Sequence, residues 1–317
     1  YELALASLEV SEGRKEFADL LTLARAVSEQ DITNGTPSDD LFVTDNLEEL
    51  YNDSIKTPGL RWRLQTLNRM LGSLRRGDFG FIFARPETGK TTFLASEVSN
   101  FAQQLHARMA SNDEEHVGPI LWFNNEEQGN KVKLRLYQAM LGLDKAQLGS
   151  NIQMNRDRYR AMGGSHIKIF DSASISRQQV EQLCAEFRPS LVIFDQLDKI
   201  KGFIGDREDL RLGTIYIWAR EIAKTYCPVI AVCQADASGE GKKYLNMDNV
   251  ANAKTAKQAE ADWILGIGKS NDEGMEYIRY LNISKNKLVG DEDTLPDRRH
   301  GRMEVLIRPD IARYEDV

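Results

Sequence analysis

Residues 79–94, Phe-Gly-Phe-Ile-Phe-Ala-Arg-Pro-Glu-Thr-Gly-Lys-Thr-Thr-Phe-Leu, decide the fold of this chain. The stretch begins as an apolar strand, continues as a loop and ends in helix-forming residues. Its loop, residues 84–91, fits the pattern G-x-x-x-x-G-K-S/T at every defined position except the first, where Ala84 replaces glycine. The strand, loop and helix together predict a binding site for a nucleoside triphosphate.

Each part of this loop has a chemical task. Inward-turned backbone N–H groups at a helix N-terminus bind phosphate oxygens, and Gly89 permits the close approach that this needs. Lys90 supplies an ammonium group to the β- and γ-phosphates, and the Thr91 hydroxyl can join the shell of a Mg²⁺ ion. The predicted cofactors are ATP or dNTP and Mg²⁺. The predicted cofactor-binding residues are Ala84, Arg85, Pro86, Glu87, Thr88, Gly89, Lys90, Thr91 and Thr92.

The composition is that of a soluble globular protein. The chain has 317 residues, of which 41% are hydrophobic, and this length allows one large or two ordinary domains. No run approaches the ~20 apolar residues of a membrane span, and the first residues do not form a signal peptide, which favours a cytosolic protein. The three cysteines and four histidines are scattered and support neither a disulfide framework nor a zinc site. The formal net charge of −7 still permits a local basic lining that binds nucleic acid.

The first 57 residues differ from the rest of the chain. Apolar residues recur at helical spacing in 16–27, and a polar stretch with Gly and Pro follows in 33–40, which predicts a helical arm and a linker. A second short helix is expected in 46–51, either as a surface helix of its own domain or as a docking helix for a neighbouring subunit. Because the chain begins with Tyr1 rather than Met, we expect 1–57 to be the remnant of, or the connection to, an N-terminal domain.

Beyond this arm, β-type and α-type segments alternate, which predicts an α/β domain with a mainly parallel sheet and helices on both faces. The clearest helix is expected in 210–226, where apolar residues form one stripe. Such sheets bind ligands at the carboxyl ends of their strands. The predicted strands are 79–84, 119–124, 167–170, 190–195, 228–234, 263–267, 277–284 and 302–307.

Three of these strand ends carry candidate catalytic or metal-binding side chains. Asp195 ends an apolar run and can reach the Mg²⁺ shell together with Thr91, although such an Asp alone more often caps a turn. Glu126 or Glu127 could polarise the water that attacks the γ-phosphate, and equally could face a helix N-terminus; we favour Glu126 as the catalytic group. Gln234 could sense the γ-phosphate or form a turn.

In this order the motifs resemble the RecA-like motor domain of DnaB-type replicative helicases, including the phage primase-helicases. The resemblance extends from Gly59 to Tyr314. It implies a RecA-like P-loop NTPase core over 58–317, places the catalytic glutamate at Glu126, and explains Ala84 as a habit of the family. The matching segments are 57–60 and 66–78 in the lead-in, 84–91 (A-R-P-x-x-G-K-T), 124–127 (S-L-E-M), 195–199 (D-Y-L-Q-L), 228–234 (P-V-I-A-L-S-Q), 259–262 (Q-D-A-D) and 312–315 (T-R-F-D).

Two departures from the family pattern affect the assignments. In place of K-x-R-x-G, whose arginine reaches the nucleotide of the neighbouring subunit, residues 285–290 read Lys-Asn-Lys-Leu-Val-Gly. Lys287 or Lys285 is therefore the candidate catalytic cation, although a lysine lacks the bidentate fork of arginine. The reserve candidates are Arg298, Arg299 and Arg302.

The second departure concerns nucleic acid. Relatives carry D-L-R-E-S-G in a DNA-binding loop, whereas residues 248–255 of this chain contain no arginine. The alternative for the lysines of this region is an ordinary solvated loop. The candidate nucleic-acid-binding residues are Lys254, Lys242, Lys243, Arg207 and Arg211.

The resemblance implies the motor of a ring-forming replicative DNA helicase, which hydrolyses ATP or dNTP, translocates on single-stranded DNA and unwinds duplex. It also implies a homo-oligomer, expected to be a hexameric ring, and primase or other replisome proteins as partners. The implied location is the bacterial cytoplasm, or that of a host for a phage protein. The alternative is a RecA-like assembly or loader ATPase, switched by nucleotide, that separates no strands.

Overall fold

The computed structural model describes residues 7, 10, 11, 46–48, 59–111, 117–203, 205, 207–252, 254–295, 297 and 299–317. The chain divides into two units, Tyr1–Thr57 and Pro58–Val317. The expected helix in 16–27 and the linker in 33–40 lie outside the described residues. Of the expected helix in 46–51, the structure describes 46–48, with Leu47 and Glu48 helical.

The second unit is built on one nine-stranded sheet with the order β3-β2-β4-β5-β1-β6-β7-β8-β9. Neighbouring strands from β3 to β6 pair in parallel, and those from β6 to β9 pair antiparallel. The mainly parallel α/β sheet predicted from the sequence is therefore confirmed. The strands are β1 (Phe79–Ala84), β2 (Ile120–Asn124), β3 (Ile167–Asp171), β4 (Leu191–Asp195), β5 (Val229–Gln234), β6 (Trp263–Gly268), β7 (Ile278–Asn286), β8 (Gly301–Arg308) and β9 (Arg313–Asp316).

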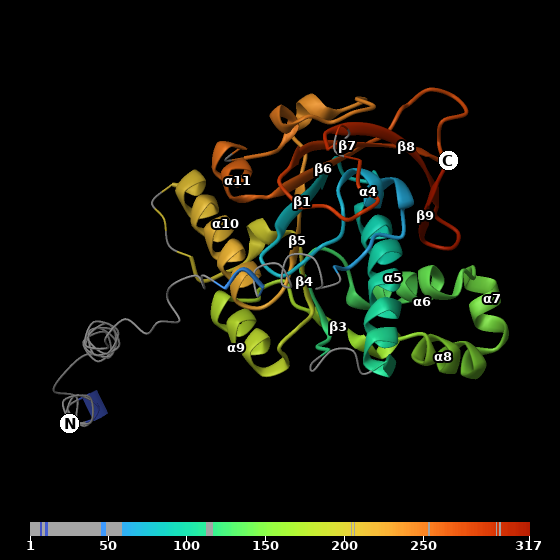
Figure 1. Cartoon of the computed structure of the whole chain (residues 1–317), viewed down its shortest axis with the longest axis horizontal. Helices are drawn as coiled ribbons and strands as arrows, with labels where there is room; N and C mark the ends of the chain where they lie inside the picture. Colours follow the sequence, from blue (N-terminus) through green and yellow to red (C-terminus); the bar gives the residue numbers. More distant parts are fainter. Residues whose placement is uncertain are drawn as a thin grey trace. The chain divides into compact units, whose positions relative to one another are not determined.

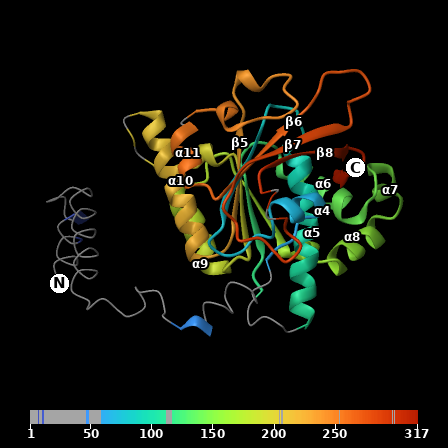
Figure 2. The same ribbon diagram turned by 45° about the horizontal axis from the view of Figure 1, so that its top comes forward.

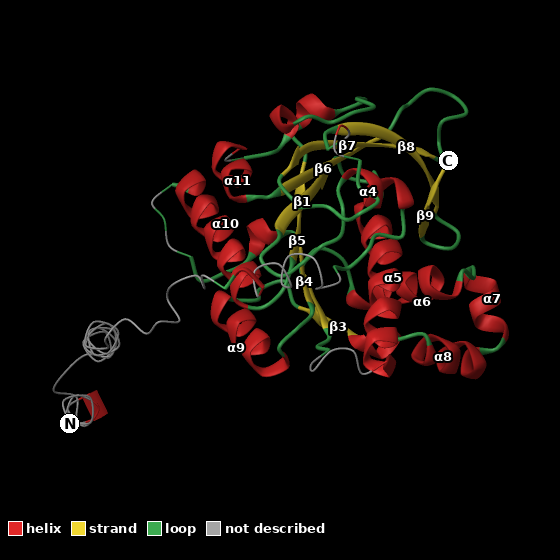
Figure 3. Ribbon diagram, in the orientation of Figure 1, coloured by secondary structure: helices red, strands yellow, loops and turns green. Residues whose placement is uncertain are grey.

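Helices cover both faces of this sheet (Figures 1, 2 and 3). Helices α5 and α6 pack over one face, and α9 and α10 pack over the other. The helices are α4 (Gln65–Met70), α5 (Lys90–Ser111), α6 (Gly129–Leu141), α7 (Lys145–Ser150), α8 (Ile152–Ala161), α9 (Arg177–Phe187), α10 (Glu208–Thr225) and α11 (Lys254–Glu260). The short 3-10 turns are η2 (Gly164–His166), η3 (Leu197–Lys199), η4 (Ala237–Gly239) and η5 (Met247–Asn249).

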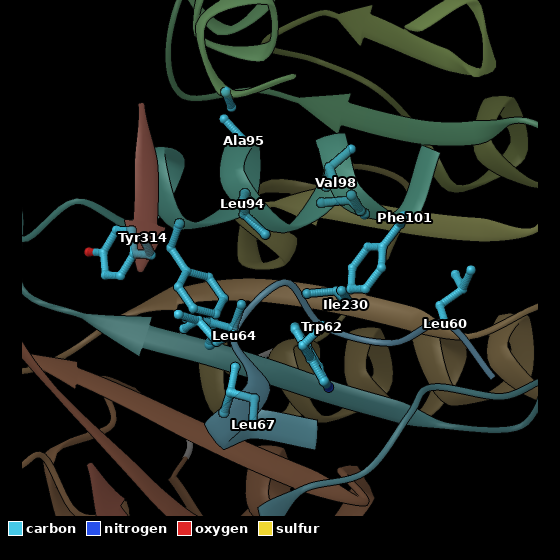
Figure 4. Close-up of a cluster of buried hydrophobic side chains, with 14 of the residues drawn as sticks. Leu60, Trp62, Leu64, Leu67, Leu94, Ala95, Val98, Phe101, Ile230 and Tyr314 are labelled. Carbon is cyan, nitrogen blue, oxygen red and sulfur yellow. The ribbon is translucent and has the colours of Figure 1, made fainter. Parts of the chain in front are cut away.

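Strand β1 is central and buried on both faces. Its residues alternate, so that Ile82 faces the cluster under α5 while Phe81 faces the cluster under α9 and α10. Gly80 interrupts this apolar strand because the Trp263 ring occupies the space beside it; a Cβ at Gly80 would lie 2.1 Å from Trp263 Cε2. The cluster under α5, which includes Trp62, is shown in Figure 4. This core fixes the direction in which β1 delivers the phosphate-binding loop.

Eight strands were expected from apolar runs, and all eight exist with ends within two residues of the prediction. The short strand β9 was not predicted as a strand. The three cysteines are buried and unpaired. Among the described residues, no helix combines the length and the apolar character needed to cross a bilayer.

One carboxyl is buried on α5, the helix that follows the phosphate-binding segment. Glu97 of α5 is fully buried and accepts a hydrogen bond from the Arg63 backbone N–H at 2.5 Å. Burial raises the pKa of Glu97 to about 8; the Arg63 backbone bond and guanidinium oppose this rise, and Asp316 adds to it. The native state therefore holds this proton at pH values where an unfolded glutamate, with a pKa of about 4.3, has lost it.

This shift predicts a pH-dependent stability. Because the native pKa is above the unfolded one, the contribution of Glu97 is fully present below about pH 4 and is lost as pH rises through about 8. Glu97→Gln keeps the acceptor and removes the titration, so its free energy of unfolding should fall less than that of wild type between about pH 6 and 9. Urea unfolding at both pH values measures this. Glu221→Gln, at an exposed position of α10, is the charge control, and equal losses in all three proteins would contradict the prediction.

Candidate nucleotide site

The phosphate-binding loop connects the end of β1 to the first residue of α5. Gly89 has a φ of +105°, which a residue with a side chain rarely adopts. A Cβ at this position would lie 2.7 Å from Ile307 Cδ1 and 2.8 Å from Tyr314 Oη. The glycine is thus required both by the backbone and by the strands packed against it.

The loop is held from behind by two side chains of the antiparallel strands. Arg279 of β7 is buried and donates from Nε to the Thr88 carbonyl at 2.7 Å. The Tyr314 hydroxyl of β9 lies 3.4 Å from the Thr88 carbonyl and 3.3 Å from that of Gly89. These bonds occupy the loop carbonyls from the rear. Sequence reasoning missed Arg279, although a charged residue within an apolar strand was a visible signal.

A cavity of about 420 Å³ opens on the other side of the loop. Loop residues and the strand-end acids Glu126 and Glu127 line this cavity together, and the sequence had placed both groups at one site. Of the nine predicted cofactor-binding residues, Ala84, Arg85 and Thr88 do not line it. The lining residues are Pro86, Glu87, Gly89, Lys90, Thr91, Thr92, Glu126, Glu127 and Arg135.

Lys90 is mostly buried and lies between the loop and the acids. Its Nζ is 3.3 Å from the Arg85 carbonyl and 3.4 Å from the Ala84 carbonyl. Burial lowers the pKa of Lys90, while Glu126 and Asp195 partly counter this. The Arg85 side chain is directed elsewhere, since it bonds Glu240 at 2.9 Å and the Ala235 carbonyl at 3.1 Å.

Among the residues that line this cavity, Arg135 is the one that the sequence analysis did not name. It lies on α6 and forms an ion pair with Glu127, in which Nη1 bonds Oε2 and Nη2 bonds Oε1 at 3.1 Å. This pairing neutralises Glu127, whereas Glu126 is exposed in the cavity. The geometry therefore favours Glu126 as the group available to a water molecule. The only advance signal was an arginine eight residues after the acids, which identifies no partner by itself.

Asp195 ends β4 and is 1% exposed. Burial, and to a smaller extent the nearby Glu126, raise the pKa of its carboxyl to about 7 against the opposing effect of Lys90. Neither carboxylate oxygen accepts a hydrogen bond of normal geometry from the described residues. Asp195 is not among the residues that line the first cavity. Carboxylate and hydroxyl oxygens are the hard donors that Mg²⁺ prefers, so Asp195 and the Thr91 hydroxyl of the loop fit the ion by their chemistry.

Gln234 ends β5 but does not line the same cavity. It opens into a second one of about 540 Å³. There it meets Gln196 and Arg211 rather than Glu126. The basic residues lining this second cavity are Lys199, Lys201 and Arg211, and the acidic ones are Asp198 and Glu208.

The candidate catalytic lysines lie at the opposite edge of the sheet. Ala84 is level with Ile267 of β6, which pairs with Leu281 of β7. Lys287 is six residues beyond Leu281, roughly 20 Å at the rise of a strand. Neither lysine can therefore reach the phosphate loop of its own subunit.

The two lysines differ in what they contact. Lys285 Nζ donates to the Gln258 carbonyl at 2.5 Å and lies 3.4 Å from the Ala259 carbonyl, so it caps the C-terminal end of α11. Lys287 is exposed and is the better placed of the two to reach a neighbour. Of the reserve arginines, Arg299 donates to the Leu288 carbonyl, Arg302 lies 5.0 Å from the Tyr244 ring centre, and Arg298 is outside the described residues.

The five candidate nucleic-acid-binding residues do not form one group. Arg211 lines the second cavity, beyond the end of β4, whereas Lys243 Nζ lies 3.1 Å from Asp272 and 5.5 Å from the Tyr280 ring centre on β7. Strands β4 and β7 are four spacings apart in the sheet, roughly 19 Å. Lys242 is next to Lys243. Near Arg211, Arg207 pairs with Asp209 at 2.9 Å, and Lys254 pairs with Asp236 at 2.6 Å.

Known proteins resemble both the sequence and this arrangement. The AAA-domain family matches residues 48–240, which is more than half of the chain. The chain belongs to this family. Its membership, its fold and the geometry of its loop make it a P-loop ATPase domain with the RecA-like architecture, for which nucleotide binding is implied.

Individual relatives narrow the likeness to the DnaB type. The replicative DNA helicase DnaB of Buchnera aphidicola subsp. Baizongia pistaciae is 26% identical over 215 residues, which are 62% of this chain and 44% of that protein. The DnaB of Synechocystis sp. is 28% identical over 211 residues, 62% of this chain and 22% of that protein. A solved DnaB-like replicative helicase, described with its interactions with primase, has a TM-score of 0.65 at 16% identity over 99% of this chain and 76% of that chain. The resemblance seen in the sequence is confirmed, and this chain spans less than half the length of the two curated relatives.

The site geometry separates the roles of the two acids. Glu126→Gln should bind nucleotide almost normally but turn over ~10²-fold or more slowly, as is typical when a general base is removed. Glu127→Gln should lose mainly the ion pair with Arg135 and keep most of the turnover. Steady-state ATPase and nucleotide affinity measure both variants. A large loss of turnover in Glu127→Gln with none in Glu126→Gln would show that Glu127, and not Glu126, is the general base.

Proposed function

We propose that this chain is the motor domain of a ring-forming replicative DNA helicase, which hydrolyses ATP or dNTP to translocate on single-stranded DNA and unwind duplex. The observation that carries the proposal is the arrangement of two cavities at the carboxyl edge of one sheet. The phosphate loop and Glu126 line one, and Gln234 lines the other with basic side chains. The DnaB relatives support the helicase reading over that of a loader ATPase.

In the proposed hydrolysis, the backbone N–H groups of the loop and the Lys90 ammonium bind the β- and γ-phosphates. Thr91 and Asp195 would hold Mg²⁺, which neutralises charge on the phosphate oxygens. Glu126 accepts a proton from the attacking water. Arg279 and Tyr314 keep the loop carbonyls turned to the rear, so that the N–H groups stay directed at the phosphates.

Two cations are proposed for the neighbouring subunit's reaction. Lys287, and with less freedom Lys285, would approach the phosphates of an adjacent copy, because the sheet separates them from their own loop. This makes a homo-oligomer part of the proposal, with a hexameric ring as the expected form. Residues 1–57 are proposed to be an arm that leads to an N-terminal domain, and primase or other replisome proteins are the proposed partners.

The second cavity is the proposed route for single-stranded DNA. Arg211 lies in its lining, Arg207 directly precedes α10, and Lys254 lies on the adjoining α11. Within the lining, Lys199, Lys201 and Arg211 are opposed by Asp198 and Glu208, and Asp198 is already paired with Lys257 at 2.5 Å. The remaining charge is positive and suits a phosphate backbone. Lys242 and Lys243 would contact the strand separately, on the β7 side. A cytoplasmic location in a bacterium, or in a phage-infected host, follows from this function.

A motor of this kind should hydrolyse ATP faster when single-stranded DNA is added, and should separate the strands of a duplex DNA substrate. Lys90→Ala should abolish both activities, because it removes the cation that binds the phosphates. Arg211→Ala should leave basal ATPase intact. In a plot of log affinity for single strands against log salt concentration, it should reduce the magnitude of the slope by ~0.7. Slow hydrolysis that does not respond to single strands, with no unwinding, would favour the loader alternative.

Shared catalysis predicts complementation between two inactive variants. Lys287→Ala and Lys90→Ala rings should each be nearly inactive, since a cation supplied to the phosphates by a neighbour is worth ~10³-fold or more. Mixtures that exchange subunits should regain ATPase, because one mixed interface pairs an intact loop with an intact Lys287. Mass measurement confirms the mixing. No recovery in mixed rings would exclude Lys287, and full activity of an isolated monomer would exclude shared catalysis.

A further inference from the structure

Lys257 of α11 is a charged side chain with no exposed surface. Its ammonium lies 2.5 Å from Asp198 Oδ2 and donates to the Ala251 carbonyl at 3.0 Å. The Tyr216 ring of α10 closes the remaining side, with its centre 5.3 Å from Nζ. One buried cation thus contacts three separate segments.

Two of these segments lead directly to strand ends at the carboxyl edge. Asp198 is three residues beyond Asp195, in the turn that follows β4. Ala251 donates its backbone N–H to the Gln234 carbonyl at 3.0 Å, where β5 ends. Lys257 therefore ties the segment after β4 to the end of β5, and does so through Ala251, which precedes Lys254 and α11.

Stability alone does not account for such a pair. Lys257 is taken fully out of water, whereas Asp198 keeps 26% of its side chain exposed. Burial of an ion costs several kcal/mol, and apolar residues of similar volume often give equal or greater stability. Removing one partner, in contrast, leaves an unpaired buried charge and is strongly destabilising. Both charges of the pair must therefore be present or both absent. Such a pair is suited to fixing the relative position of the segments that it connects.

We propose that Lys257 is a positioning residue which, through Asp198 and Ala251, couples the nucleotide-side strand ends to residues 248–254. The inference rests on the proposed function, because that loop is assigned to nucleic acid there. Lys257 itself lines neither cavity and acts through its partners. A shift of Gln234 moves Ala251 directly, whereas a shift of Asp195 moves Asp198, and the shared ammonium transmits that shift to Ala251.

The test removes the pair as a unit. Asp198→Asn/Lys257→Met deletes both charges at nearly constant volume, so its melting temperature should stay within a few degrees of wild type. Stimulation by saturating single-stranded DNA, expressed relative to each protein's own ATPase rate without DNA, should fall at least about five-fold. Strand affinity is measured alongside, because Asp198 lines the second cavity. Full stimulation in a stably folded double variant would overturn the inference. A wild type that shows no stimulation would remove the proposed function, and the inference with it.

A second measurement needs no DNA. Binding of a non-hydrolysable ATP analogue should change amide hydrogen exchange in 248–254 of wild type, and this change should be absent in the double variant although the analogue still binds. The matched control is Arg75→Met/Asp291→Asn, which removes another mostly buried ion pair of 2.7 Å that touches neither cavity. This control should keep the exchange change and the stimulation. If the double variant unfolds, Lys257→Met alone carries the same expectation, because the Asp198 carboxyl that it leaves is 26% exposed and can be hydrated. An unaltered exchange change in either variant would overturn the coupling.

Discussion

The left-handed backbone at Gly89 is the constraint on which the rest of the site depends. It turns the loop N–H groups toward the cavity and the carbonyls of Thr88 and Gly89 toward Arg279 and Tyr314. Those two side chains come from β7 and β9, which follow the loop in the sequence by nearly two hundred residues or more. The phosphate loop is therefore not a local motif alone, because the antiparallel half of the sheet completes it. This explains why the parallel core and the three antiparallel strands form one unit.

The strands and the main site could be predicted because their signals are local. An apolar run ending in Asp195, or a loop ending in Gly89-Lys90-Thr91, needs no knowledge of distant residues. Strand β9 was missed because its four residues are too short and too polar for a periodic pattern. Arg135 and Arg279 were missed because their roles come from partners on other elements. The spread of Lys243 and Arg211 over four strand spacings follows from strand order, which charge clustering in the sequence does not encode.

The phosphate-binding groups and the candidate catalytic lysines lie at opposite edges of the sheet. The carboxyl edge carries the phosphate loop, Glu126 and Asp195, and the opposite edge carries Lys285 and Lys287. A chain arranged in this way holds an incomplete set of charges at each edge. In the proposed oligomer, contact between the opposite edges of two copies would supply cations to the phosphates, which a monomer could not do. The replacement of arginine by lysine makes this contact a point charge rather than a fork, so its geometry depends more on the strand that holds it.

Burial at the carboxyl edge prepares the site for charged ligands. Burial raises the pKa of Asp195 to about 7 and lowers that of Lys90, so each group is less disposed to carry its charge than in water. A triphosphate with Mg²⁺ brings the opposite charges to both groups and favours their ionised forms. Lys257 differs, because its counter-charge, Asp198, is part of the fold. The carboxyl edge thus combines charges that a ligand would complete with the Lys257–Asp198 pair, which is complete within the fold and, beside the Lys254–Asp236 pair, helps to hold residues 248–252 in place before nucleotide arrives.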